Sequence, residues 1–137
     1  MMINIKQLLY LGLMTLSVNL WAQKPHSVEN QAKFDAEVIN VMPYVKPLAK
    51  PAKARKILVL SKAAGWYHSS IETGKISFQE MGKSTGAFSV DINDEPSFYT
   101  AENLKAYDAI LFNNTTYSQD YFNENQRRAI LGFIKNG

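Results

Sequence analysis

The sequence predicts an α/β domain built on a doubly wound parallel sheet, and three short segments lead to that prediction. Residues 57–60 and 109–112 are continuously apolar, which is typical of strands buried on both faces of a parallel sheet. Residues 88–93 alternate apolar and polar side chains, which indicates a strand with one face in water. We therefore expect the alternating strand to lie outermost, and the first strand to neighbour 109–112 as a buried central strand. Right-handed crossovers would connect them.

Two segments with helical periodicity separate and follow these strands. Residues 70–85 repeat apolar or small residues at steps of three and four, and Gly86 would end this helix in the left-handed conformation. The residues expected to face the sheet are Ile71, Gly74, Phe78, Met81 and Thr85. Asn123 and Gln126 have the spacing of a capping box at the start of a last helix. Its expected buried stripe is Ala129, Ile130, Phe133 and Ile134. Thr100 is expected to cap a short helical turn.

Composition places the chain among globular proteins and excludes several kinds of site. The 137 residues are 46% hydrophobic and 20% charged, which fits one modest folded domain. The net charge is +3, and the basic residues are scattered along the chain, so we expect no nucleic-acid partner. A mild basic cluster at 46–56 is interrupted by prolines and is interpreted as a solvated linker. Because the chain has no cysteine, these residues form no disulfide, thiolate metal site or cysteine nucleophile.

The first 22 residues have the pattern of a secretory signal peptide. Lys6 supplies a positive charge, residues 8–16 supply a short apolar stretch, and Ala22 is a small residue suited to cleavage before Gln23. We expect export to the periplasm or the outside of the cell, with membrane contact only through this peptide. The alternative is an uncleaved anchor, although the apolar stretch is short for a span of about 20 residues.

Residues 23–54 are expected to precede the sheet as a separate preamble. Residues 28–42 have a loose helical spacing of apolar side chains. Pro43 and Pro47 would end this helix, because the residue before a proline avoids the α region. The remaining stretch to Ala54 is interpreted as an extended, proline-rich linker.

His68 is the first candidate for a functional residue. Ligands of open α/β sheets bind just outside the carboxyl ends of the strands, and His68 lies between the first strand and the helix 70–85. A neutral imidazole suits acid/base chemistry or a divalent metal, and a helix N-terminus favours the neutral form. The alternative is a histidine that only bonds to loop backbone. No second histidine has metal-ligand spacing, so the other ligands of a metal would have to come from outside these residues.

A second set of candidates follows the strand 109–112. Asn113, Asn114 and Thr115, with Thr116 after them, offer amides and hydroxyls that suit sugar hydroxyls or an oxyanion. Turn formation is the competing explanation. The two strand-end loops should face each other, which would bring Tyr67 and His68 near 113–116. Trp66, Tyr67 and Tyr117 could stack on a sugar ring or could cover the edge of the core.

Several other polar groups are interpreted as structural. Asp91, Asp94 and Glu95 form a local acidic cluster, which we interpret as a solvated loop. Ser69 and Ser70 adjoin His68, but neighbouring residues rarely aim at each other, so neither is expected to be a nucleophile. The chain has no glycine-rich phosphate-binding loop.

Three separated motifs resemble the ThuA-like (trehalose utilisation) family, whose fold resembles that of the class I glutamine amidotransferases. The motifs are R-K-I-L-V-L-S-K-A-A-G-W-Y-H-S-S-I at 55–71, G-A-F-S-V-D-I-N-D-E-P-S-F-Y at 86–99, and E-N-L-K-A-Y-D-A-I-L-F-N-N-T-T at 102–116. The resemblance implies a flavodoxin-like sheet over 55–137. Family members continue into a strand ending in Gly-Ile-His, so these residues are expected to hold only the first half of the fold.

The resemblance also implies a function in carbohydrate utilisation, with trehalose or an oxidised glycoside as the class of ligand. The site would be the crevice at His68 and Asn113–Thr116. Two possibilities stay open at this point: an enzyme assisted by His68 or by a divalent metal, and a non-catalytic module that binds carbohydrate or another partner.

Overall fold

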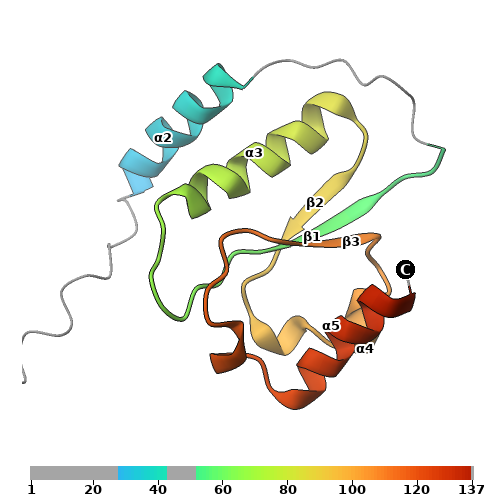
Figure 1. Cartoon of the computed structure of the whole chain (residues 1–137). Helices are drawn as coiled ribbons and strands as arrows, with labels where there is room; N and C mark the ends of the chain where they lie inside the picture. Colours follow the sequence, from blue (N-terminus) through green and yellow to red (C-terminus); the bar gives the residue numbers. More distant parts are fainter. Residues whose placement is uncertain (1–27, 43–51, 137) are drawn as a thin grey trace, which may run out of the picture.

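A computed structural model describes residues 28–42 and 52–136 of the chain (Figure 1). Its elements, in order, are α2 (Val28–Val41), β1 (Lys56–Leu60), α3 (Ser70–Thr85), β2 (Ser89–Ile92), the 3-10 turn η1 (Pro96–Phe98), α4 (Ala101–Leu104), β3 (Ala109–Phe112), the 3-10 turn η2 (Ser118–Asp120) and α5 (Glu124–Asn136). The predicted signal peptide and the two prolines after α2 lie outside the described residues. Within the described ranges, no helix is long and apolar enough to cross a bilayer.

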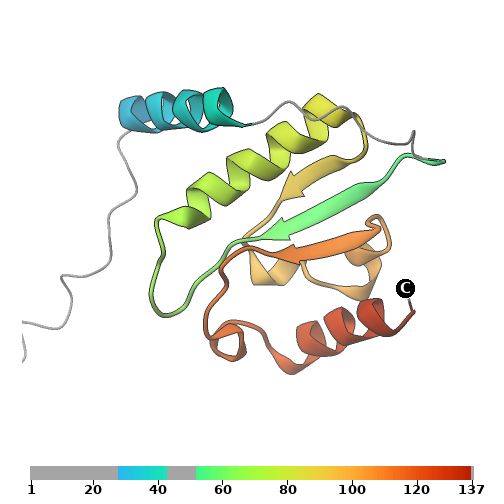
Figure 2. The same ribbon diagram turned by 45° about the horizontal axis from the view of Figure 1, so that its top comes forward.

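The three strands form one parallel sheet in the order β2-β1-β3. Ile57 of β1 is opposite Val90 on one side and Ala109 on the other. Helices α2 and α3 lie on one side of the sheet, and α5 lies on the other (Figure 2). The predictions of a parallel α/β sheet and of an outermost strand at 88–93 are therefore confirmed, because β1 separates β2 from β3.

The cap residues behave as their side-chain chemistry predicts. Gly86 has φ +62° and donates its N–H to Gly82 at 2.9 Å, which ends α3. Thr100 Oγ1 accepts the N–H of Asn103 at 3.2 Å at the start of α4. Asn123 Oδ1 accepts the N–H of Gln126 at 3.0 Å, and Gln126 Oε1 accepts the N–H of Asn123 at 2.8 Å. This reciprocal pair is the capping box predicted for α5.

The main core lies between the sheet and the α4–α5 side. Its buried members are Leu58, Leu60, Tyr99, Leu104, Phe122 and Ile130. Tyr99 and Phe122 meet edge to face with ring centroids 5.1 Å apart, which is a favoured aromatic geometry. The Tyr99 hydroxyl donates to the Asn93 carbonyl at 2.7 Å. Burial of this tyrosine is therefore achieved without an unpaired hydroxyl.

The predicted helix faces are only partly correct. On α3, Ile71 is fully buried, but Met81 is 39% exposed and its neighbour Gly82 is buried instead. A Cβ at Gly82 would lie 2.7 Å from the carbonyl oxygen of Phe88, so the helix approaches β2 where a side chain is missing. On α5, Ile130 is buried but Ile134 is 61% exposed. Helix α5 packs beside α4, and Ile130, Ala129 and Phe133 are its residues at the core.

The prediction that 109–112 is a buried central strand stays a prediction, because it depends on a neighbour from the second half of the fold. β3 is at one edge of the sheet and pairs only with β1. Ala109 is exposed and Phe112 is 42% exposed. An apolar run predicts burial only when both neighbours and both faces are supplied by the fold, and here one edge has no described neighbour.

Candidate functional site

Polar side chains at the carboxyl ends of the three strands bond to one another. Ser61 follows β1 and Asn113 follows β3, and their exposed fractions are only 1% and 7%. Asn113 Nδ2 donates to Ser61 Oγ at 3.1 Å. The backbone N–H of Ser61 donates to Oδ1 of Asp94, which follows β2, at 2.6 Å. These bonds satisfy buried polar groups that would otherwise be costly to desolvate, and they tie the three strand ends together.

Asn113 is held between the sheet and α3. Its Nδ2 also donates to the Ile71 carbonyl at 2.9 Å. A Cβ at Gly74 would lie 2.3 Å from Asn113 Oδ1, so the glycine makes room for the amide. Asn113 therefore occupies the predicted place at the strand end, with its amide donors bonded inside the protein.

The loops after β1 and β3 run side by side, as the topology predicts. Ala63 and Thr116 form an isolated parallel bridge, and the N–H of Ala64 donates to the Thr116 carbonyl at 3.1 Å. The Tyr117 ring lies over Gly65, where an added Cβ would come within 2.3 Å of the ring. The pairing of β1 with β3 thus continues beyond the strands and aligns the two loops.

His68, Ser70 and Asn114 form a chain of hydrogen bonds between these loops. His68 Nδ1 lies 2.8 Å from Ser70 Oγ and accepts the Ser70 backbone N–H at 3.2 Å. Asn114 Nδ2 donates to Ser70 Oγ at 2.6 Å. All three bonds are in the exposed part of the site, and no described residue bonds to His68 Nε2. The expectation that neither adjacent serine aims at His68 is wrong for Ser70, because the first turn of α3 directs its hydroxyl back to the ring.

A second network connects the loop after β1 to α3 and to the end of β2. The Tyr67 hydroxyl donates to Glu72, and Lys75 Nζ lies 3.4 Å from Glu72 Oε1 and 2.8 Å from Asp94 Oδ2. Burial, together with the bond to Glu72 and its charge, raises the pKa of Tyr67. Burial lowers the pKa of Lys75, but bonds to the carboxylates of Asp94 and Glu72 outweigh it, so the net pKa is raised. The lysine is therefore a firmly charged bridge.

Sequence reasoning missed Glu72 and Lys75, although their spacing of three along a helix is typical of an ion pair. It also interpreted Asp91 and Asp94 as parts of one solvated cluster. In the structure, Asp91 lies within β2 and pairs with Lys56 at 2.7 Å, while Asp94 follows β2 and binds Lys75 and the Ser61 N–H. The two aspartates therefore belong to different networks.

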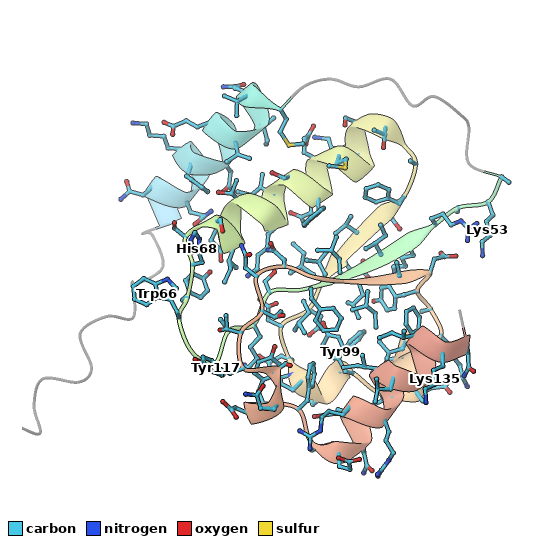
Figure 3. The ribbon with its side chains drawn as sticks, viewed as in Figure 1. Lys53, Trp66, His68, Tyr99, Tyr117 and Lys135 are labelled. Carbon is cyan, nitrogen blue, oxygen red and sulfur yellow. The ribbon has the colours of Figure 1, made fainter. Side chains whose placement is uncertain are left out.

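Two exposed aromatic rings lie on the loops that carry His68 and Asn114. Trp66 and Tyr117 are each 57% exposed, whereas Tyr67 and Thr115 are half-buried. Figure 3 places Trp66, His68 and Tyr117 at the same end of the molecule. The arrangement presents flat apolar surfaces beside an imidazole and two polar side chains.

The comparison with known families identifies the chain. Residues 56–137 match the family model ThuA, described as trehalose utilisation. The chain belongs to the ThuA family. The match covers the sheet, α3 to α5 and every site residue described above, and it indicates an involvement in trehalose utilisation. No curated protein and no solved structure matches the chain.

The described residues of the ThuA domain offer few side chains that could serve as metal ligands. No three His, Cys, Asp or Glu side chains within 28–42 and 52–136 lie close enough to hold an ion. His68 Nδ1 is engaged by Ser70, and the nearby Glu72 is bonded to Tyr67 and Lys75. His68 Nε2 is the atom that this part of the chain offers, and one imidazole does not make a site.

Two depressions of the ThuA domain lie away from the strand-end site. Their volumes are about 490 Å³ and 360 Å³, and both are lined by Ala101, Arg128 and Ala129 of α4 and α5. His68 and the loop 113–117 line neither of them. The strand-end site is formed by the loops after β1 and β3 and is separate from these two depressions.

Proposed function

We propose that this ThuA domain binds a sugar derivative, of the trehalose or oxidised-glycoside class, on the surface formed by the loops after β1 and β3. The hydrogen-bonded chain from Asn114 through Ser70 to the exposed His68 carries this proposal. It offers an orientated imidazole to a ligand at the carboxyl end of the sheet, where ligands of such sheets bind.

Two further features fit a sugar better than a charged metabolite. Trp66 exposes a large ring surface near His68, and Tyr117 exposes another at the same end of the molecule. Sugar sites combine apolar surface with a few well-placed polar groups. Lys75 is neutralised by Glu72 and Asp94, so it does not provide a free positive charge. The site is therefore suited to a neutral ligand rich in oxygen acceptors.

His68 would also serve a reaction, because an imidazole exchanges protons near neutral pH. In this proposal His68 donates a hydrogen bond to an oxygen of the glycoside. A non-catalytic binding module is the second candidate, and the exposed rings of Trp66 and Tyr117 favour it. The two candidates differ in whether the sugar is changed after it binds.

The test of binding uses tryptophan fluorescence of the full chain. The chain has two tryptophans, Trp21 and Trp66, and a Trp21→Phe variant leaves only the one at the site. Titration with trehalose or a glycoside should change its emission, and the added substitution Trp66→Phe should remove the signal. Calorimetry then gives the affinity independently of the fluorophore. Absence of heat and of any emission change with these sugars would contradict the proposed ligand class.

His68→Ala separates the functional role of this residue from a structural one. We expect roughly tenfold weaker sugar binding and, for an enzyme, a rate lowered by about 10²–10⁴-fold, with an unchanged melting temperature. Gln79→Ala, at an exposed position later on α3, is the matched control. A lower melting temperature with normal activity per folded molecule would instead make His68 structural.

We also propose that the chain is exported and that its mature form begins at Gln23. The positive Lys6, the apolar stretch at 8–16 and the small Ala22 support this. N-terminal sequencing of the protein recovered outside the cytoplasm should identify Gln23 or a close neighbour. Recovery of the chain only inside the cell, with Met1 intact, would contradict export.

A further inference from the structure

We infer that Ser70 and Asn114 are positioning residues, which hold the His68 imidazole in the tautomer that has its proton on Nε2. The inference concerns the state of the ring before any ligand binds. The sequence motifs predicted no positioning role for either residue, and three hydrogen bonds now point to one.

The backbone N–H of Ser70 decides the tautomer. This group can only donate, and it points to His68 Nδ1 at 3.2 Å. Nδ1 must therefore be the unprotonated nitrogen. The neutral ring then carries its proton on Nε2.

The side chains of Ser70 and Asn114 support the same state. Asn114 Nδ2 donates to Ser70 Oγ at 2.6 Å, so the hydroxyl accepts from Asn114 and is free to donate its own hydrogen. Its remaining near neighbour is His68 Nδ1 at 2.8 Å. The donors in the series from Asn114 through Ser70 to His68 thus all point toward Nδ1. A hydrogen on Nδ1 would oppose the Ser70 N–H.

The backbone at Asn114 fits this role. Its φ is +52°, a left-handed conformation that asparagine adopts more readily than most residues. The conformation lies directly after the buried Asn113, whose amide is fastened to Ser61 and Ile71. The position of the Asn114 side chain is therefore set by the strand end and not by an unconstrained loop.

A consequence follows for the ligand, and it rests on the proposed function. With its proton on Nε2, His68 presents a donor to the site, so the atom that meets it is an oxygen acceptor. A metal ion needs a lone pair on the nitrogen that it binds. Binding through Nε2 would require moving the proton to Nδ1, against the Ser70 N–H.

Nitrogen NMR of the full chain tests the tautomer directly. The chain has two histidines, His26 and His68, so a His26→Gln variant leaves a single imidazole to assign. Long-range proton–nitrogen spectra near neutral pH should show one protonated and one unprotonated nitrogen, with the proton on Nε2. In the same background, Ser70→Ala and Asn114→Gly should shift the two nitrogen resonances part of the way toward an averaged mixture of tautomers, because the Ser70 backbone N–H still donates to Nδ1 in both variants. Ser70→Thr, which restores a hydroxyl, should return the pattern toward the wild type.

The outcomes separate this inference from the proposed function. A proton on Nδ1, or an averaged ring in the parent protein, would overturn the inference whether or not a sugar binds. An Nε2 proton that persists unchanged in Ser70→Ala and Asn114→Gly would remove the positioning role of both side chains. If the tautomer is as stated but trehalose and glycosides do not bind, the inference stands and the proposed function fails. If they bind, we expect roughly 2- to 10-fold weaker affinity in Ser70→Ala, with recovery in Ser70→Thr.

Discussion

The amide of Asn113 has two acceptors, the Ser61 hydroxyl at 3.1 Å and the Ile71 carbonyl at 2.9 Å. At the level of single residues, such contacts are what keep the strand ends close to α3. They need space as well as partners, and Gly74 provides it, because a Cβ there would meet Asn113 Oδ1 at 2.3 Å. Substitution at this helical glycine therefore changes more than helix propensity.

Gly74→Ala should destabilise the domain by up to about 2 kcal/mol. Alanine favours a helix by about 1 kcal/mol over glycine, but the new methyl group would displace Asn113 and leave buried polar groups unpaired, at a cost of about 1–3 kcal/mol. Urea unfolding measures the difference. Gly132→Ala on α5 is the control, since nothing lies within 4 Å of a Cβ added there. This substitution should stabilise the domain. A stabilising Gly74→Ala would show that Asn113 is not held as described.

Asp108 predicts a dependence of stability on pH. The ammonium group of Lys53, the backbone N–H of Lys56 and the guanidinium group of Arg55 hold the pKa of Asp108 below its usual range. A carboxyl whose pKa is lower in the folded state contributes stability above its unfolded pKa of about 4, and loses it as the pH falls further.

Asp108→Asn should therefore lower the urea midpoint at about pH 7. The fall of the urea midpoint between about pH 7 and about pH 3 should also be smaller in this variant than in the parent. Glu95→Gln is the control, because Glu95 forms no ion pair in the described part of the chain. Its urea midpoint should fall on acidification by as much as that of the parent. An equal fall in Asp108→Asn and in the parent would argue against the role of Asp108.

At the level of elements, α3 is fastened at its start to both neighbouring strand ends. Lys75 lies one turn into the helix, has a side chain that is 19% exposed, and bridges Glu72 and Asp94. Asp94 in turn accepts the Ser61 N–H. The lysine thus links α3 to β2 and, through Asp94, to β1.

Lys75→Met should lower the free energy of unfolding by about 1–2 kcal/mol, because it leaves two partly buried carboxylates without their cation. The matched control is Lys83→Met on the same helix, where the lysine side chain is 79% exposed and lies 3.5 Å from Glu80; its effect should stay below about 0.5 kcal/mol. Chemical denaturation of both variants measures this. Similar losses in the two variants would show that the bridge adds nothing.

At the level of the whole molecule, the two edges of the sheet differ. β2 carries Asp91, whose side chain is 43% exposed, and a charged residue discourages pairing with another chain. β3 is entirely apolar, pairs only with β1 in the described part of the chain, and leaves Phe112 42% exposed. The β3 edge is therefore the place where we expect contact with other chains.

The purified 137-residue protein should self-associate as its concentration rises. Phe112→Lys should reduce this association. Sedimentation velocity over a range of concentrations measures it, with circular dichroism to verify that the variant is folded. Trp66→Lys is the control, since Trp66 is more exposed than Phe112 but lies on a loop. A monomeric parent at every concentration, with a sharp and reversible unfolding transition, would refute this prediction.

Local sequence patterns were sufficient for the elements and their order. The helix predicted at 70–85 is present as Ser70–Thr85, and the capping box of Asn123 and Gln126 is formed. The alternating strand lies outermost. These features depend on residues close together in the chain, or on the rules that connect parallel strands, so a single sequence contains the necessary information.

The partners of individual side chains were decided only by tertiary structure. Ser61 meets Asp94, 33 residues away, and Asn113, 52 residues away. Asn113 is buried rather than open, Ser70 reaches His68, and the apolar β3 is partly exposed at an edge. The physical reason is that these outcomes depend on how closely α3 and the two strand-end loops approach each other. That approach is set by packing at small residues such as Gly74 and by the number of neighbours that each strand has, and periodicity along the chain contains neither.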